Sequence, residues 1–258
     1  MDWNLLKERD PSLATFYRAV AGCKYNCPAI TNCPKSGDWP RGFYTEAARP
    51  IRVLAILENP GPASSIEKEF GKEISGLPQG SLPDVLAAKS FNMVANQMAT
   101  VMADPPKSEH DLGRRTGGPF KITRLHRGLV YILSRVLDVE PENVYKSAAH
   151  TNAVKCSGPT GLHKDHNNGW QTLRRCGHEF LKREIKLYNP KVILAITHDA
   201  DWLLRELQDD EQDPIRIPFV YIQHPQSWYS PMVINKVAGQ IESAREALRR
   251  VEFGEVSV

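Results

Sequence analysis

Short apolar runs that alternate with longer amphipathic stretches constrain this chain more than any other feature of its sequence. The runs IRVLAIL at 51–57 and KVILAIT at 191–197 are nearly continuous in apolar residues. A strand that is apolar on both faces belongs in a parallel sheet that is covered on both sides. The pattern predicts a three-layer α/β/α sandwich with a central, mostly parallel sheet of about four strands.

The other elements continue this alternation. Further strands are predicted over 144–156 and 217–223. Helical periodicity predicts helices over 1–22, 85–102, 122–139, 173–190, 198–207 and 233–251. We interpret residues 1–258 as a single domain that begins with a helix and a cysteine-containing loop over 1–50.

Composition restricts the class of protein. Hydrophobic residues make up 41% of the chain and charged residues 24%, which is enough for an ordinary core. No apolar run approaches the roughly 20 residues that span a bilayer, and the charged N-terminus lacks a signal-peptide core. We therefore expect a cytoplasmic protein without a membrane partner. A net charge of +3 permits a local basic face but does not demonstrate nucleic-acid binding.

The chain has five cysteines, at Cys23, Cys27, Cys33, Cys156 and Cys176. Disulfides are rare in the cytoplasm, where clustered cysteines more often bind metal. One reading is a set of scattered buried thiols. The sharper reading is a four-thiolate site with one cysteine to spare. Zinc and iron–sulfur clusters both accept four cysteines, and spacing alone does not separate them.

Polar residues follow three of the predicted strands. Glu58 and Asn59 precede a Pro-Gly turn, Asn152 lies near the end of 144–156, and His224 follows the last strand. In open parallel sheets, ligands bind outside the carboxyl ends of the strands. An Asn carboxamide at such a place has the donors and the acceptor to recognise the edge of a flat heterocycle. Plain tight turns are the alternative reading of the residues beside Pro.

At these residues the chain resembles the uracil-DNA glycosylase superfamily, above all its bacterial and archaeal branches that carry a 4Fe-4S cluster. The resemblance covers roughly residues 15–250, with the motifs in the family's order. The matching segments are Glu58-Asn59-Pro60-Gly61, Pro119-Phe120, Val144-Tyr145, Thr151-Asn152-Ala153-Val154-Lys155-Cys156, Cys176, Pro190-Lys191-Val192-Ile193 and His224-Pro225.

The resemblance implies a monofunctional DNA glycosylase that flips a uracil or another modified pyrimidine out of DNA and hydrolyses its N-glycosidic bond. It implies base binding by Phe120 and Asn152. It gives catalytic roles to Glu58, Asn59 and His224, with Glu58 or Asn59 positioning the attacking water. The DNA contacts that it implies are Pro60, Gly61, Pro225, Ser227 and Trp228, the last as a wedge that fills the gap left by the base.

The resemblance also implies that Cys23, Cys27, Cys156 and Cys176 hold a 4Fe-4S cluster. Cys33 is a rival ligand, because the spacing of the N-terminal cysteines departs from the family's pattern. Zinc is the alternative metal. DNA is the only partner expected of a monomeric prokaryotic protein of this kind.

Three departures from the family pattern keep other functions open. Leu57 stands where the family has Gly, Asn59 where cluster-bearing members have Ala, and 62–118 is an insertion beside the base pocket. One alternative is a glycosylase specific for a bulky modified base in foreign DNA, such as phage DNA. A second is a catalytically silent iron–sulfur protein that binds nucleic acid. A third is a small-molecule enzyme that uses Glu58 and His224.

Overall fold

The fold is α/β, with a central sheet of five strands in the order β1-β3-β2-β4-β5. The computed structural model describes residues 2–23, 25, 27, 43–58, 82–113, 122–156, 162, 167–228 and 230–254. The strands are β1 Tyr44–Thr45, β2 Val53–Leu57, β3 Ala148–Asn152, β4 Val192–Ala195 and β5 Phe219–Tyr221. β1 pairs antiparallel with β3, and all other pairs are parallel.

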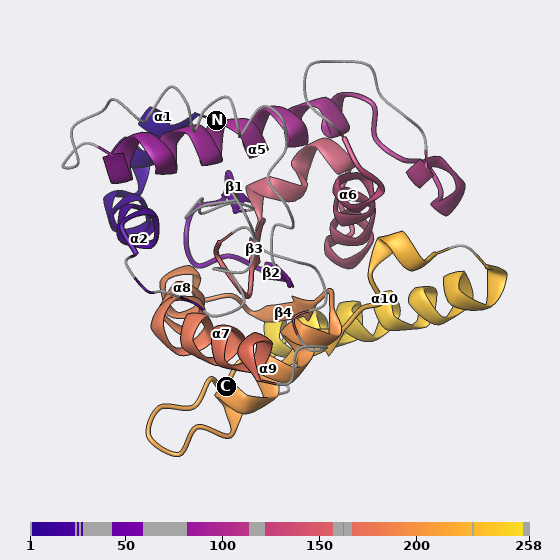
Figure 1. Ribbon diagram of the computed structural model, residues 1–258. Coiled ribbons are helices and arrows are strands. Elements are labelled where there is room, and N and C mark those ends of the chain that lie inside the picture. The colour runs from indigo at the N-terminus through magenta and orange to yellow at the C-terminus, as the bar shows by residue number, and fades with distance from the viewer. Residues whose placement is uncertain are drawn as a thin grey trace.

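Helices cover both faces of this sheet. The α-helices are α1 Trp3–Arg9, α2 Pro11–Ala21, α5 Leu82–Ala103, α6 Arg124–Leu137, α7 Asn168–Cys176, α8 Lys182–Tyr188, α9 His198–Gln208 and α10 Pro231–Glu252. Short 3-10 helices are η1 Glu109–Gly113, η2 Pro141–Lys146 and η5 Pro225–Ser227, and η4 Gly177–Leu181 is a π-helical turn between α7 and α8. Figure 1 shows α7, α8 and α9 together on one side of the sheet and α6 on the other.

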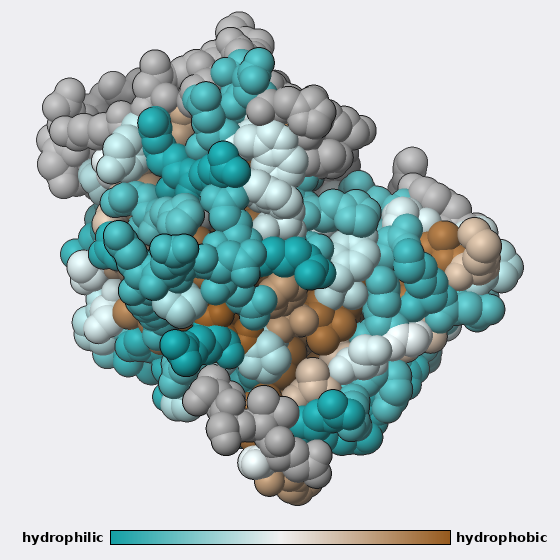
Figure 2. Space-filling view, turned by 90° about the horizontal axis from the view of Figure 1, so that it is seen from below, coloured by the Kyte–Doolittle hydropathy of each residue, from teal (hydrophilic) through white to brown (hydrophobic). Residues whose placement is uncertain are grey.

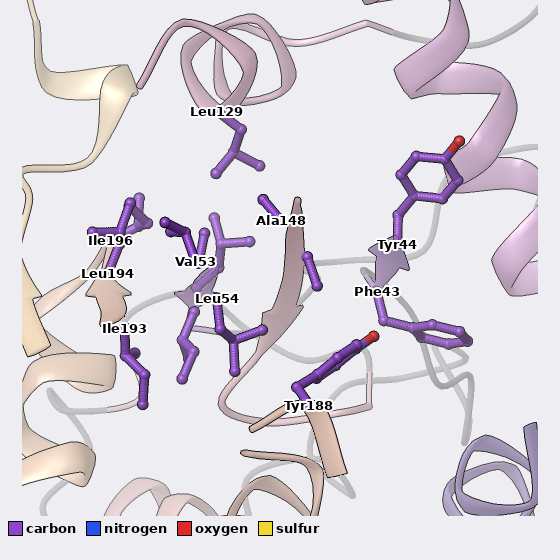
Figure 3. Close-up of a cluster of buried hydrophobic side chains, with 14 of the residues drawn as sticks. Phe43, Tyr44, Val53, Leu54, Leu129, Ala148, Tyr188, Ile193, Leu194 and Ile196 are labelled. Atoms are coloured by element: carbon purple, nitrogen blue, oxygen red, sulfur yellow. The ribbon is translucent and has the colours of Figure 1, made fainter. Parts of the chain in front are cut away.

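The core is a single cluster built around the central strands, whose residues are buried on both faces. Figure 3 shows Leu129 of α6 above the sheet, and Tyr188 of α8 and Ile193 of β4 below it. The near-continuous apolar runs of the sequence are explained by this double coverage. The predicted three-layer class is therefore confirmed, with five strands in place of about four.

Several element boundaries differ from the predicted ones for local reasons. The predicted helix over 1–22 is two helices, because the Asp10 side chain accepts a hydrogen bond from Leu13 N (3.0 Å) and so caps a new helix that begins at Pro11. Val144 and Tyr145 belong to η2, so the strand predicted over 144–156 is shorter. The helix predicted over 173–190 begins earlier and contains a π-helical turn directly after Cys176.

Part of the predicted insertion belongs to the core. α5 packs against α2 and buries Phe91, Met98 and Val101. Met98 also receives a hydrogen bond from the Tyr145 hydroxyl to its sulfur (3.2 Å). The described part of 62–118 is thus tied into the molecule by apolar packing and not attached only at its ends.

The surface is mostly hydrophilic where Figure 2 views the molecule, with an apolar patch near the centre of that face. Among the described residues, no helix combines the length and the apolar character that crossing a bilayer requires.

Candidate functional site

Three strand ends bring the predicted polar side chains to one edge of the sheet. Leu57, the last residue of β2, is in register with Asn152, the last residue of β3. A hydrogen bond from Val154 N to Glu58 O (2.8 Å) extends this pairing. β5 runs parallel to β4 and ends at the same edge, shortly before His224. We call this edge, with Glu58, Asn152 and His224, the polar edge.

The strand fixes the direction of the Asn152 side chain, which is only 3% exposed. Side chains alternate along a strand, so Asn152 shares a face with His150. Thr151 points to the opposite face, where its hydroxyl donates a hydrogen bond to Glu184 of α8 (2.9 Å). Asn152 therefore faces the α6 side of the sheet and is held rigidly at the end of β3.

Burial keeps His224 neutral at physiological pH, because it lowers the pKa of the imidazole to about 4. Its Nδ1 accepts a hydrogen bond from Gln226 N (3.2 Å). In a neutral imidazole whose Nδ1 is an acceptor, Nε2 carries the proton. His224 is thus a neutral hydrogen-bond donor through Nε2.

The turn that carries His224 is held against α6. A Cβ added to Gly128 would lie 2.3 Å from Pro225 Cβ, so this close approach requires Gly. Arg124 donates a hydrogen bond from Nη2 to Trp228 O (2.5 Å), and Ser227 donates one from Oγ to His224 O (2.7 Å). Pro225 and Ser227 therefore shape the turn itself, and their predicted contact with DNA stays a prediction.

The position of Trp228 does not fit the prediction that it inserts into DNA. Its side chain is 1% exposed, its Nε1 donates to Gln223 O (2.8 Å), and its ring packs edge-on against Tyr131. A Trp with its N–H satisfied inside the protein behaves as core. Met232, in the first turn of α10, is an apolar side chain that is 78% exposed.

Glu58 is half-buried and has a structural role that the sequence did not predict. Its Oε1 accepts a hydrogen bond from Leu162 N (2.9 Å). The same segment lies against the start of α7, where a Cβ added to Gly169 would lie 1.8 Å from Leu162 O. Glu58 therefore anchors the chain between β3 and α7. Five predicted site residues, namely Asn59, Pro60, Gly61, Phe120 and Cys33, lie outside the described residues.

Four of the five cysteines line one cavity, which we call the cysteine cavity. Cys23 and Cys27 follow α2, Cys156 follows β3, and Cys176 ends α7. The cavity is partly open to solvent. The other lining residues are Val20, Tyr25, Val154, Lys155, Arg175 and Phe180. Four cysteines from three distant segments thus meet as the sequence predicted.

The surroundings of the cysteine cavity suit bound thiolates. Burial raises the pKa of Cys176 to about 12, while Lys155 acts in the opposite direction. The main-chain N of Lys155 donates a hydrogen bond to Cys176 Sγ (3.3 Å). The Arg175 guanidinium lies over the Tyr25 ring, 5.4 Å from its centroid. A cation and an N–H···S bond both favour sulfur in its anionic form.

The donor set of four cysteines is one that zinc and an iron–sulfur cluster both accept. A single zinc ion needs its sulfurs at about 2.3 Å from one centre. Within the described part of the chain, no three His, Cys, Asp or Glu side chains are grouped so as to hold one ion.

A buried ion pair between these two regions was missed from the sequence. Lys155 and Glu184 pair through Nζ and Oε2, at 3% and 0% side-chain exposure. One signal was present, because Glu184 lies on the helical stripe of the buried residues Leu181, Ile185 and Tyr188. A buried carboxylate on such a stripe needs a cationic partner, but the helical pattern does not identify the residue that provides it.

No protein-family model matches this chain, and no curated protein is significantly similar to it. Its function is inferred from the polar edge and the cysteine cavity.

Proposed function

We propose that this chain is a monofunctional DNA glycosylase that flips a modified pyrimidine, uracil first among them, out of DNA and hydrolyses its N-glycosidic bond. One observation carries the proposal. A neutral His224 and a buried Asn152 lie at the carboxyl edge of the sheet, and four cysteines gather directly beyond that strand end. The order of motifs in the sequence, which resembles the uracil-DNA glycosylases, gives this geometry its chemical meaning.

In this proposal Asn152 recognises the flipped base. Its carboxamide offers two donors and an acceptor, which match the pairing edge of a pyrimidine. Because the strand and its buried neighbours fix the side chain, little conformational entropy is lost when the base binds. The base itself has to leave the stack, at a cost of a few kcal/mol.

His224 stabilises the leaving base. Breaking the N-glycosidic bond places negative charge on the base and positive charge on the sugar. The Nε2 proton of a neutral imidazole donates a hydrogen bond to the base oxygen on which the negative charge develops. Removing one such donor typically costs about 10² to 10³ in rate. Protons balance when water adds to the sugar carbon and the departing base takes up the water's second proton.

Glu58 stabilises the positive charge of the sugar and positions water, alone or with Asn59. Its hydrogen bond from Leu162 N uses one carboxylate oxygen and leaves the charge in place. Met232 replaces Trp228 as the proposed wedge, because it is exposed at the start of the helix that follows the His224 turn.

A 4Fe-4S cluster held by Cys23, Cys27, Cys156 and Cys176 is the proposed cofactor, with zinc as the alternative metal and Cys33 as the rival ligand. When bound, it supplies a structural cross-link between the end of α2, the end of β3 and α7. The described residues around it contribute the Lys155 amide and the Arg175 cation.

A second candidate is a catalytically silent protein that binds DNA. The hydrogen bond from Leu162 N to Glu58 Oε1 favours it, because it gives the proposed catalytic carboxylate a structural use. A third possibility, selectivity for a bulky modified base in foreign DNA, rests on Leu57 at the end of β2, where a bulkier residue than Gly narrows the polar edge.

Base release from a panel of oligonucleotides tests the proposal. The panel holds uracil in single strands, opposite G and opposite A, and then bulky modified pyrimidines. We expect free base and an abasic strand without a nick, and Asn152→Ala should abolish release while the protein stays folded. No release from any member would favour the silent binding protein. A borohydride-trapped covalent complex would contradict the monofunctional mechanism.

A further inference from the structure

Lys155 is a buried lysine whose ammonium is fully used by the protein. Its exposure is 2%. The three N–H donors have three partners, namely Thr151 Oγ1 (2.8 Å), the main-chain O of Asn152 (2.6 Å) and the Glu184 carboxylate. The partner that matters most is the carbonyl of Asn152, because the side chain of that residue faces the polar edge.

Glu184 is anchored from the opposite side. Its exposure is 0%, and its Oε2 accepts hydrogen bonds from Thr151 and Lys155. Its Oε1 accepts one from the Tyr17 hydroxyl, which is 2.9 Å from the Tyr188 hydroxyl. The pair is therefore held by α2, β3 and α8 together and cannot relax toward solvent.

Stability alone does not explain a buried ion pair. Replacing such a pair by apolar residues of similar volume is often neutral or stabilising, whereas removing one partner is strongly destabilising. A conformational role is the attested alternative. Here the ammonium contacts the main chain at the one residue of β3 whose side chain is proposed to recognise the base.

Lys155 also lies at the cysteine cavity. It is one of the lining residues, and its main-chain N donates a hydrogen bond to Cys176 Sγ. Two uses of the ammonium can therefore be distinguished. It either balances the charge of a thiolate-bound metal, or it fixes the strand end that carries Asn152. The three hydrogen bonds of the ammonium go to oxygen atoms of Thr151, Asn152 and Glu184.

We infer that Lys155 is a positioning residue for base recognition, which fixes the main-chain carbonyl of Asn152 and through it the carboxamide at the polar edge. This inference rests on the proposed function. It predicts that losing the ammonium weakens binding to DNA that presents the base, while binding to DNA that lacks the base stays unchanged. A charge-balancing role would give the opposite pattern, with metal lost and base preference kept.

The test compares wild type with Lys155→Met/Glu184→Gln, which removes both charges and leaves Tyr17 an acceptor. The probes are two labelled duplexes. One duplex carries the base that wild type releases fastest, attached to a 2′-fluorinated sugar so that its glycosidic bond resists cleavage. The other duplex carries an abasic analogue. Fluorescence anisotropy gives the ratio of the two affinities, and iron and sulfide per chain are measured on the same samples.

We expect the double variant to keep its iron. Its ratio of affinities for the base-bearing and abasic duplexes should fall about tenfold, which is equivalent to the loss of one charge-assisted hydrogen bond. Arg52→Met/Glu252→Gln is the matched control. It removes a half-buried ion pair at the opposite end of β2, where Arg52 Nε donates to Glu252 Oε1 (2.7 Å). Its ratio should match that of wild type.

An unchanged ratio in Lys155→Met/Glu184→Gln would overturn the inference, whatever its iron content. If the ratio falls but that variant has also lost its iron, or if it does not fold, Thr151→Val decides, because it removes one anchor of the ammonium in a side chain of equal size. Its ratio should fall about threefold, and no change would again overturn the inference. If wild type releases no base and has no base preference, the proposed function fails and the inference with it.

Discussion

The polar edge and the cysteine cavity lie a few residues apart on one segment, but burial has opposite consequences in them. At the polar edge, burial lowers the pKa of His224 to about 4 and so keeps a donor neutral, which is the form that its proposed role requires. In the cysteine cavity, burial raises the pKa of Cys176 to about 12 and so opposes the thiolate, which is the form a metal requires.

The two regions differ in whether the proposed charge state of their side chains depends on a bound metal. His224 and Glu58 already have hydrogen-bond partners in the described chain. In the cysteine cavity, Cys176 Sγ accepts a hydrogen bond from Lys155 N, and a metal bound by the four cysteines would offset the cost of burying their thiolates. We therefore expect changes in the cysteine cavity to act mainly on folding, and changes at the polar edge to act mainly on binding and rate.

The largest effect is expected from Cys156→Ala. The variant should lose its iron, its colour and several kcal/mol of folding free energy, because metal binding and folding are linked. Iron content and thermal unfolding measure this. Cys27→Ala and Cys33→Ala form a matched pair that identifies the remaining ligand, since only one of them should behave like Cys156→Ala. A stable, fully active Cys156→Ala protein would contradict the structural role of the cavity.

Lys155→Met should be the next most damaging change. It leaves the Glu184 carboxylate buried without its cation, which costs about 3–5 kcal/mol of folding free energy in urea titration. Lys155→Met/Glu184→Gln should recover a large part of this loss, because no unpaired charge remains. If the single and double variants were equally unstable, the buried charge would not be the cause.

His224→Ala should lower base release by about 10² to 10³ with little change in unfolding free energy. His224→Asn is the control for the turn, because its side chain can still accept the hydrogen bond from Gln226 N. It should keep the stability of wild type but not its rate. Equal rates in His224→Asn and wild type would remove the imidazole from the mechanism.

The pH profile of base release tests whether His224 acts as a neutral imidazole. A neutral His224 predicts a rate without an inflection near the ordinary histidine pKa of about 6.5. The rate should fall only below about pH 4, where protonation of Nδ1 ends its bond with Gln226 N. A loss of rate centred between pH 6 and 7 would mean that His224 titrates normally.

Acid should also destabilise the fold through His150. Burial lowers its pKa to about 3, so between about pH 6.5 and 3 the unfolded chain binds a proton that the folded chain does not. The contribution of His150 to the free energy of unfolding is therefore fully present above pH 6.5. It falls with decreasing pH by about 1.4 kcal/mol per pH unit. His150→Asn should flatten that slope in urea titrations between pH 4 and 6, and an unchanged slope would contradict the shift.

The smallest effects come from single methyl groups. Gly128→Ala should displace Pro225 and lower base release several-fold, because the added Cβ meets the proline ring. Gly239→Ala in α10 is the matched control, with no atom within 4 Å of the added Cβ. It should be neutral or stabilise the protein by about 0.5–1 kcal/mol. Equal rates in the two variants would show that the His224 turn does not depend on α6.

The sequence predicted the sheet and the polar edge better than the packing around them. Apolar runs that are buried on both faces define β2 and β4, and the rule that parallel strands end at one edge places Asn152 beside Leu57. The burial of Trp228 could not be read from sequence, because its partner Tyr131 comes from another helix. The pairing of Lys155 with Glu184 was hidden for the same reason, since it depends on the way α8 packs against β3.

The central claim is that one segment, from Asn152 to Cys156, serves a base-recognition site and a metal cluster. Counting iron and acid-labile sulfide in protein purified without oxygen tests it most directly. We expect four of each per chain, as four cysteine ligands around a 4Fe-4S cluster require, and we expect both to be lost in Cys176→Ala. A stable protein that contains a single zinc ion, or no metal at all, would contradict it.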